Sequence, residues 1–194
     1  MDPNKIILET RTEARKSKDG NAETCFLAIA DSDGQASVRT LVLRDMIDNR
    51  YTLFINETSP KWQLLSQNSH YELLLWYPTQ QKQFRINGSC HLLPHDEVSD
   101  KWQGRPDGSK YMDVLYQSHP QSSVIASRAE LESRIHKIKI ESVIKSMSPP
   151  MEVRGVELIA NKIEVLDLNN TDRLHDRQVF TLENKQWTSE VLIP

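Results

Sequence analysis

The segment 173–177, Arg-Leu-His-Asp-Arg, is the densest polar cluster in the chain. In an extended backbone, Arg173, His175 and Arg177 would project on one face. Three cations on one face repel one another unless an anionic ligand or an acidic partner compensates them. The segment therefore predicts an anion-binding position, and a charged hairpin end is the alternative.

A second candidate anion site lies at 56–62, Asn-Glu-Thr-Ser-Pro-Lys-Trp. Ser59 is a good helix N-cap, and Pro60 fits the first helical position. Lys61 then falls in the first turn, where a cation faces the positive end of the helix dipole. Backbone N–H groups, the Ser59 hydroxyl and the Lys61 ammonium could converge on a phosphate. The alternative is an ordinary capped helix with a solvated lysine.

Polar side chains on two predicted strands could contact a ligand. Arg39 and Arg44 lie near the ends of the strand expected at 36–44, on opposite faces, so one patch cannot hold both. Arginine is the usual choice for bidentate phosphate recognition. Gln83, in the strand expected at 83–87, could pair with the donor and acceptor edges of a heterocycle. Each is also compatible with an ordinary solvent-facing position.

The turn 105–109 could aim the Arg105 guanidinium and the Ser109 hydroxyl at a second phosphate, although a plain surface turn is also possible. The histidines outside 173–177, His70 among them, show no metal-ligand spacing, so we expect no metal site. A Gly-rich phosphate loop and a Gly-x-Ser-x-Gly nucleophile elbow are both absent from the sequence.

Composition restricts the class of protein. The length of 194 residues suits a single domain, 1–194, with an N-terminal helix and linker at 1–20. A net charge of -3 disfavours nucleic acid as a partner. Uninterrupted apolar stretches stay well below the ~18 residues of a membrane span, which argues against a membrane protein. Two cysteines make no disulfide framework, so we expect a cytoplasmic location.

The elements that must position these residues are mostly strands, with helices in the middle of the chain. Closely spaced strands joined by turns indicate an antiparallel barrel, and the fold class is therefore mainly β with peripheral helices. Asp2 and Pro3 are typical of a helix start. The expected strands are 24–30, 36–44, 51–55, 71–76, 83–87 continuing past a bulge or bend at Gly88 to 93, 156–160, 162–168, 178–182 and 187–193. The expected helices are 97–103, 110–117 and one from the Ser127–Glu130 capping box to about 145.

The order of these motifs resembles the pyridoxamine 5'-phosphate oxidase family of FMN-binding split barrels, above all its shorter, single-domain members. The resemblance covers about 24–194 and is carried by the segments 173–177, 39–44, 83–88 and 119–123. It implies a dimeric split β-barrel that binds FMN.

The resemblance also implies roles for single residues. Arg39, Ser59 and Lys61 would hold the FMN phosphate, and Gln121 and Ser122 would reach the cofactor from the other subunit, so a homodimer with FMN at its interface is implied. The implied cofactor-binding set is Arg39, Thr40, Leu41, Val42, Leu43, Arg44, Phe54, Ile55, Ser59, Lys61, Gln83, Gln121, Ser122 and Arg177. The implied substrate-binding set is Arg44, Arg105, Ser109, Arg173 and His175, with Arg173 and His175 as the catalytic residues over the substrate ring.

The implied reaction is hydride transfer from the C4' carbon of pyridoxine or pyridoxamine 5'-phosphate to flavin N5, with reoxidation by dioxygen. Four departures from the family pattern weaken the match at the substrate and flavin: Arg44 in place of lysine, Pro60 in place of arginine, Lys101 in place of tyrosine, and Leu166 or Asp167 in place of tryptophan. The alternatives are an FMN-dependent reductase or oxidoreductase of another small substrate, or a non-catalytic flavin-binding protein.

Overall fold

The computed structural model describes residues 2–67, 71–142 and 144–194. These residues form two compact units. The sheet unit comprises 2–53, 71–91 and 157–194, and the helical unit comprises 54–67, 92–142 and 144–156. The chain therefore passes from one unit to the other four times.

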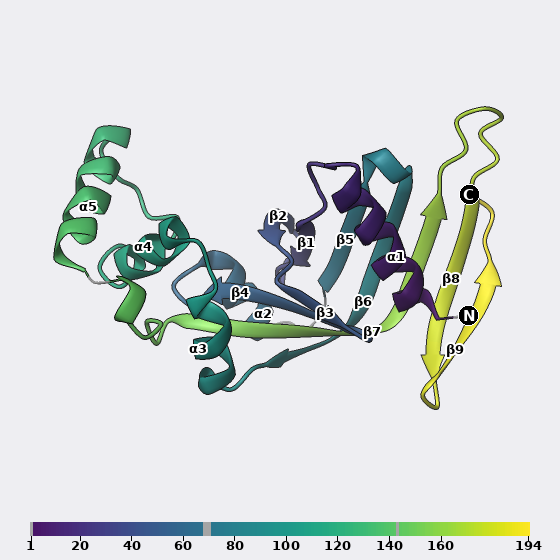
Figure 1. Cartoon of the computed structure of the whole chain (residues 1–194). Helices are drawn as coiled ribbons and strands as arrows, with labels where there is room; N and C mark the ends of the chain where they lie inside the picture. The colour runs from purple at the N-terminus through teal and green to yellow at the C-terminus, as the bar shows by residue number, and fades with distance from the viewer. Residues whose placement is uncertain (1, 68–70, 143) are drawn as a thin grey trace. The chain divides into compact units, whose positions relative to one another are not determined.

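The sheet unit is built on one nine-stranded sheet (Figure 1). The strand order is β2-β1-β5-β6-β7-β4-β3, and β8 pairs with β7 and with β9. The expectation of a mainly β chain with helices in its middle is confirmed. The strands are β1 (Thr24–Ala30), β2 (Ala36–Val42), β3 (Asp45–Ile47), β4 (Arg50–Asn56), β5 (Tyr71–Tyr77), β6 (Lys82–Leu92), β7 (Val153–Asp167), β8 (Asp176–Glu183) and β9 (Gln186–Val191).

The core of the sheet unit follows from alternation along the strands. In β5, Leu73, Leu75 and Tyr77 are buried, while the residues between them are half-buried. The same alternation along β1 and β6 buries one face of each strand. The Tyr77 and Phe84 rings meet edge to face with centroids 6.2 Å apart. The alternate residues, on the opposite face of β1 and β5, are half-buried.

Helix α1 (Pro3–Lys16) begins as the sequence predicts. The Asp2 side chain accepts a hydrogen bond from the Asn4 backbone N–H, and Pro3 occupies the first turn. Arg11 anchors the helix to the sheet unit, because its buried guanidinium donates to the backbone oxygens of Ala22 and Leu43. Within the described residues, no helix is both long enough and apolar enough to cross a membrane.

The helical unit contains α2 (Pro60–Gln67), α3 (His95–Gln103), α4 (Asp107–Tyr116) and α5 (Arg128–Glu141). Val98, Trp102, Ile144 and Val153 form its buried apolar core. Helix α5 packs against α4 and starts at the expected capping box, where the Ser127 hydroxyl accepts from the Glu130 N–H at 3.1 Å.

Several predicted boundaries are wrong. The strands expected at 156–160 and 162–168 are one continuous strand, β7, because the backbone remains paired through the exposed residues Asn161 and Lys162. Strand β2 ends at Val42, which leaves Arg44 beyond it. Helix α5 ends at Glu141 rather than near 145, and a short 3-10 turn follows at Ile144–Ser146. The short strand β3 was not expected.

Gly88 lies inside β6, which continues through it to Leu92. We expected a bulge or bend there, but the structure gives another reason for glycine. A Cβ atom on Gly88 would lie 1.8 Å from the Ile159 carbonyl oxygen and 2.9 Å from the Ala160 Cα atom of β7. The close approach of two backbones therefore requires a residue without a side chain.

We expect Gly88→Ala to lower the free energy of unfolding by at least about 1–3 kcal/mol, because the new methyl group meets backbone and one strand must shift. Urea denaturation measures this loss. Gly20→Ala is the matched control, since nothing lies within 4 Å of the Cβ position there. Equal stability of the two variants would contradict the close approach.

Candidate functional site

A buried cation lies at the start of α2, in the helical unit. Lys61 is 9% exposed, and its Nζ donates to Gln121 Oε1 at 2.7 Å. Ser59 is the N-cap as predicted: its Oγ accepts from the Trp62 N–H at 3.4 Å and donates to the Asn56 carbonyl at 2.6 Å. The Gln121 N–H donates to Thr58 Oγ1 at 3.0 Å and so joins the segment 119–123 to the start of this helix.

This donor set fits the phosphate of FMN. The Lys61 ammonium lies at a helix N-terminus, where an anion would offset the unfavourable position of the lysine. A further donor is close in sequence, because the buried Nδ2 of Asn56 has no hydrogen-bond partner among the described residues. We call Asn56, Ser59, Lys61 and Gln121 the α2 cluster.

Ser122 has a constrained backbone. The Ser123 N–H donates to the Pro120 carbonyl at 3.0 Å, and Ser122 has φ +74°. This is the third position of a type II turn, which usually holds glycine or asparagine. The resemblance implies that Gln121 and Ser122 reach the cofactor of the other subunit. In this chain Gln121 contacts Lys61 of its own subunit.

A second cluster of the helical unit lies at the start of α4. Arg105 pairs with Asp113, and Trp102 Nε1 donates to Asp113 Oδ2 at 2.8 Å. The Arg105 guanidinium also lies 5.5 Å from the Phe54 ring centroid. Ser109 is not in a surface turn as expected, because α4 already begins at Asp107. Asp113 follows Ser109 by four residues, which is the spacing that could have indicated a shared helix face.

The predicted residues of β2 lie on an exposed strand of the sheet unit. Arg39 donates to the neighbouring Val38 carbonyl at 2.8 Å. Beyond the strand, Leu43 is buried and the half-buried Arg44 donates its backbone N–H to the Thr52 carbonyl at 3.0 Å. The remaining predicted residues of β2 are Thr40, Leu41 and Val42, and Ile55 is buried on β4 in the helical unit.

An ion-pair ladder crosses four strands of the sheet unit, on the face that carries Gln83. Arg85 pairs with Glu72 and lies 3.5 Å from Glu164. Arg177 makes two hydrogen bonds to the Glu164 carboxylate, at 3.0 and 3.1 Å. The Arg177 guanidinium on β8 is therefore held by a carboxylate of the adjacent strand, β7. The sequence reasoning missed Glu72 and Glu164, although both alternate with buried apolar residues.

The segment 173–177 is extended only from Asp176, where β8 begins, so Arg173 and His175 do not meet the condition of an extended backbone for one cationic face. Arg173 has φ +65°, and its carbonyl accepts from the His175 N–H at 3.0 Å. The side chain of Asp172 accepts from the Leu174 N–H, which stabilises the turn. His175 Nδ1 accepts from the Asn169 N–H at 3.0 Å, so a neutral His175 ring carries its proton on Nε2.

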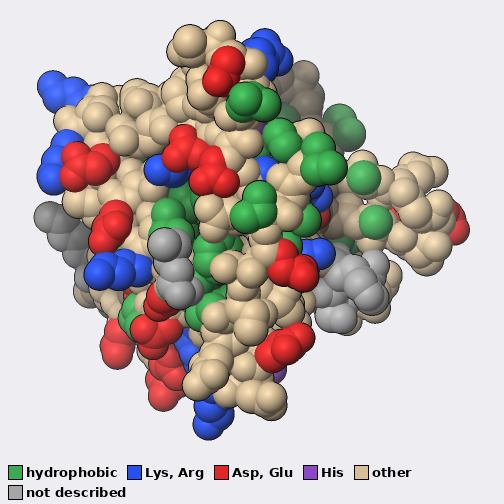
Figure 2. Space-filling view, turned by 90° about the vertical axis from the view of Figure 1, so that its right-hand side faces the viewer, with side chains coloured by type: hydrophobic (Ala, Val, Ile, Leu, Met, Phe, Trp, Pro, Cys, Tyr) green, Lys and Arg blue, Asp and Glu red, His purple; other side chains and the backbone are tan. Residues whose placement is uncertain are grey.

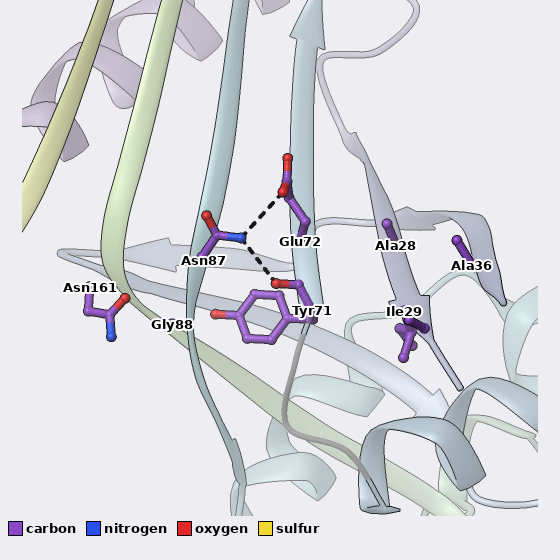
Figure 3. Close-up of a pocket in the computed structure, with 9 residues that line it drawn as sticks. Ala28, Ile29, Ala36, Tyr71, Glu72, Asn87, Gly88 and Asn161 are labelled. Atoms are coloured by element: carbon purple, nitrogen blue, oxygen red, sulfur yellow. Dashed lines mark hydrogen bonds between the residues drawn. The ribbon is translucent and has the colours of Figure 1, made fainter. Parts of the chain in front are cut away.

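A pocket of about 430 Å³ in the sheet unit lies apart from the predicted site residues. Figure 3 shows the Asn87 amide within it, bonded to Glu72 and to the Tyr71 carbonyl. The Asn87 Nδ2 group and the Glu72 carboxylate are therefore already partnered. The lining residues are Ala28, Ile29, Ala30, Ala36, Tyr71, Glu72, Asn87, Gly88 and Asn161.

Charged side chains are interspersed on the surface. On the face in Figure 2, acidic and basic groups alternate without a broad basic area, in line with the net charge of -3. Across the part of the chain that the structure describes, no group of three His, Cys, Asp or Glu side chains could hold a metal ion. His70 lies outside the described residues.

Known proteins resemble this chain over most of its length. The family model described as pyridoxamine 5'-phosphate oxidase matches residues 11–141. A pyridoxine/pyridoxamine 5'-phosphate oxidase of Leptospira biflexa is 31% identical over the whole chain and 90% of the relative. One of Pseudomonas putida is 32% identical over 89% of the chain and 79% of the relative.

Two solved structures share the fold. PhzG from Burkholderia lata, in complex with tetrahydrophenazine-1-carboxylic acid, has a TM-score of 0.86 at 22% identity and covers all of this chain and 93% of its own. A pyridoxamine 5'-phosphate oxidase-related, FMN-binding protein from Nostoc punctiforme has a TM-score of 0.77 at 18% identity. The match covers 97% of this chain and 95% of that protein. The split-barrel fold class predicted from the sequence is confirmed.

The ladder generates a prediction about pH. Hydrogen bonds from Arg85 hold the pKa of Glu72 below its ordinary value. A lowered folded-state pKa stabilises the fold above the unfolded-state pKa, about 4.3, and this contribution is lost as the pH falls through the folded-state value. We expect Glu72→Gln to lower the free energy of unfolding by about 1 kcal/mol at pH 7 and by much less below about pH 4.

Urea denaturation at pH 7 and at pH 3.5 measures this difference. Glu9→Gln serves as control, because Glu9 is exposed and lies 4.0 Å from Lys5. A loss in Glu72→Gln that is independent of pH would mean that packing, not charge, accounts for it.

Proposed function

The chain belongs to the pyridoxamine 5'-phosphate oxidase family, and from this membership and the two clusters of the helical unit we propose that it is an FMN-dependent oxidoreductase. Its substrate would be a small ring compound with an acidic group, and pyridoxine and pyridoxamine 5'-phosphate are the compounds that the relatives' names indicate. The observation that carries the proposal is the buried Lys61, held by Gln121 at the capped start of α2.

In this proposal the α2 cluster binds the cofactor phosphate. The Lys61 ammonium would supply the charge, the Asn56 Nδ2 group would supply a directed donor, and Gln121 would hold the ammonium in place. Ser59 would contribute by capping the helix rather than as a donor, because its hydroxyl donates to the Asn56 carbonyl. From the sheet unit, Arg39 and the strand residues 40–44 would contribute at the phosphate, and Gln83 and Arg177 at the flavin ring. Phe54, Ile55 and Ser122 complete the proposed set.

The chain's own residues would then orient the substrate. Arg44, Arg105 and Ser109 would hold its acidic group, and Arg173 and His175 would lie over its ring. The Nδ1 bond to Asn169 orients the His175 ring and leaves Nε2–H as a donor. When bound, FMN would accept a hydride from the substrate and pass the electrons to dioxygen. The residues around it would supply orientation and exclude water.

The proposal includes a homodimer with FMN at its interface and a cytoplasmic location. Support for a dimer comes from the apolar side chains that β2 exposes: Val38 is 57% exposed and Val42 is 42% exposed. Side chains of this kind are commonly covered in an assembly.

A second candidate function is the same flavin chemistry on a substrate whose acidic group is not a phosphate. Arg105, a proposed phosphate ligand, is already paired with Asp113, and Lys101 replaces a tyrosine of the family pattern. PhzG, in complex with tetrahydrophenazine-1-carboxylic acid, is an example of this fold with a ring carboxylic acid. A flavin reductase or a non-catalytic flavin carrier would share the α2 cluster and would lack turnover of either acid.

The absorption spectrum of the purified protein, before and after addition of FMN, tests the cofactor. Turnover of pyridoxine and pyridoxamine 5'-phosphate by the FMN-loaded protein then tests the reaction. We expect flavin bands and formation of pyridoxal 5'-phosphate. A protein that does not bind FMN would overturn the proposal. Bound FMN without turnover would reject these two substrates and leave the second candidate.

We expect Lys61→Met to weaken FMN binding about 10- to 100-fold, because a charge-assisted hydrogen bond contributes roughly 1.5–3 kcal/mol. Methionine keeps the aliphatic part of the side chain buried. Quenching of FMN fluorescence measures the dissociation constant. Lys137→Met removes an exposed lysine of the same unit and should leave the constant unchanged. An unchanged constant in Lys61→Met would reject the role of the α2 cluster.

Arg173→Ala should retain FMN and reduce kcat/KM by at least tenfold, because Arg173 is proposed to lie over the substrate and not the cofactor. Fluorescence quenching and steady-state oxygen consumption measure the two effects separately. Thr171→Ala, in the same loop, is the control. Equal losses of FMN binding and turnover would contradict a substrate role for Arg173.

A further inference from the structure

Helix α4 carries three polar residues on one stripe. Ser109, Asp113 and Tyr116 follow one another at spacings of four and three residues, so their side chains share one face of the helix. Asp113 is 5% exposed, and its carboxylate accepts from Trp102 Nε1 and pairs with Arg105. A buried aspartate therefore lies beside the arginine that the proposed function assigns to the substrate's acidic group.

The Arg105 side chain is fixed in place, but its Nε–H group donates no hydrogen bond to the described residues. Its side chain is 11% exposed, Nη1 binds Asp113, and the guanidinium lies over the Phe54 ring. The buried Nε has no hydrogen-bond partner among the described residues. Buried N–H groups are almost always paired, so an acceptor on a ligand is the natural partner of this one.

The charges around this Nε–H group are balanced. Lys110 is buried, donates to the Gln103 carbonyl at 2.8 Å and lies 3.8 Å from the Asp107 carboxylate. Two cations, Arg105 and Lys110, thus face two carboxylates, Asp107 and Asp113. Nearby Tyr116 is neutral, because burial and then the charge of Asp113 raise its pKa. The cluster has no excess positive charge to offer a dianion.

We propose that Asp113 determines the specificity of this subsite, so that Arg105 and Ser109 take a singly charged carboxylate in preference to a phosphate dianion. The inference rests on the proposed function, which places the acidic group of the substrate at these two residues. A carboxylate oxygen accepts from Arg105 Nε and a second from the Ser109 hydroxyl. A dianion brings twice the negative charge against the buried Asp113 carboxylate, where solvent screens the repulsion poorly.

The competing role for Asp113 is to orient Arg105 for a phosphate, as carboxylates do for many binding arginines. The two roles predict opposite effects of removing the charge. If Asp113 repels a dianion, its neutral isostere binds phosphate more tightly. If it only orients Arg105, the isostere binds phosphate more weakly.

Two probes with the same ring separate these roles: benzoate, a monoanion, and phenyl phosphate, a dianion at pH 7.5. Calorimetry with the FMN-loaded protein measures both dissociation constants. For the wild-type chain we expect benzoate to bind more tightly. For Asp113→Asn we expect phenyl phosphate to bind at least tenfold more tightly than in wild type, with a change in benzoate below threefold. Glu141→Gln removes one negative charge at an exposed position on α5 of the same unit and should change either constant less than twofold.

Unchanged or weaker binding of phenyl phosphate by Asp113→Asn would overturn the inference. A second measurement needs no variant: it compares the dissociation constants of the two probes for the wild-type protein. The inference is also overturned if phenyl phosphate binds more tightly than benzoate, or if neither probe binds. FMN content is read separately from the absorption spectrum. Loss of flavin binding in the wild type would refute the proposed function, whereas the wrong probe order at full FMN occupancy would refute only the role of Asp113.

Discussion

Lys61 is a buried ammonium group at the positive end of a helix, and its contact with Gln121 joins two distant segments of the helical unit. Both burial and the helix dipole disfavour a cation there. The chain compensates with an amide oxygen from a distant segment, since Gln121 accepts from Lys61 and is itself tied to Thr58 by its backbone N–H. The helix start, the turn at 119–123 and the buried Ser59 hydroxyl are thereby fixed relative to one another. An anion bound here would offset the unfavourable position of the lysine.

The arginines of the candidate site differ from free cations, because carboxylates already hold two of them. Glu164 binds Arg177 in the sheet unit, and Asp113 binds Arg105 in the helical unit. These pairs give each guanidinium one orientation and lower the positive charge that a ligand meets. In the proposed function, a chain with a net charge of -3 would present these arginines to an anion, and selectivity would arise from the local charge balance rather than from a basic surface.

The sequence predicts helix starts whose residues are adjacent, but it misses one local turn and the carboxylate partners of two arginines. The α2 start is predictable because Ser59, Pro60 and Lys61 are adjacent, and the same holds for the caps at Asp2 and Ser127. The turn at Arg173 is missed because side chains of its own loop bend the backbone out of an extended form. Glu164 and Asp113 are missed because strand register and a helix turn bring them to their arginines, 13 and 8 residues away. The family motifs identify candidate residues in both units and leave these carboxylate partners unmarked.

The helical unit is assembled from two stretches of chain, and this has a consequence for synthesis. The ribosome produces Lys61 long before Gln121, which lies 60 residues further along. At about 5–20 residues per second, the lysine waits roughly 3 to 12 s for its amide partner. Until then the Lys61 ammonium lacks the amide oxygen that compensates its burial. In the proposed function, this cluster would therefore bind the flavin only after Gln121 has been translated, and the nascent N-terminal third would not bind it in advance.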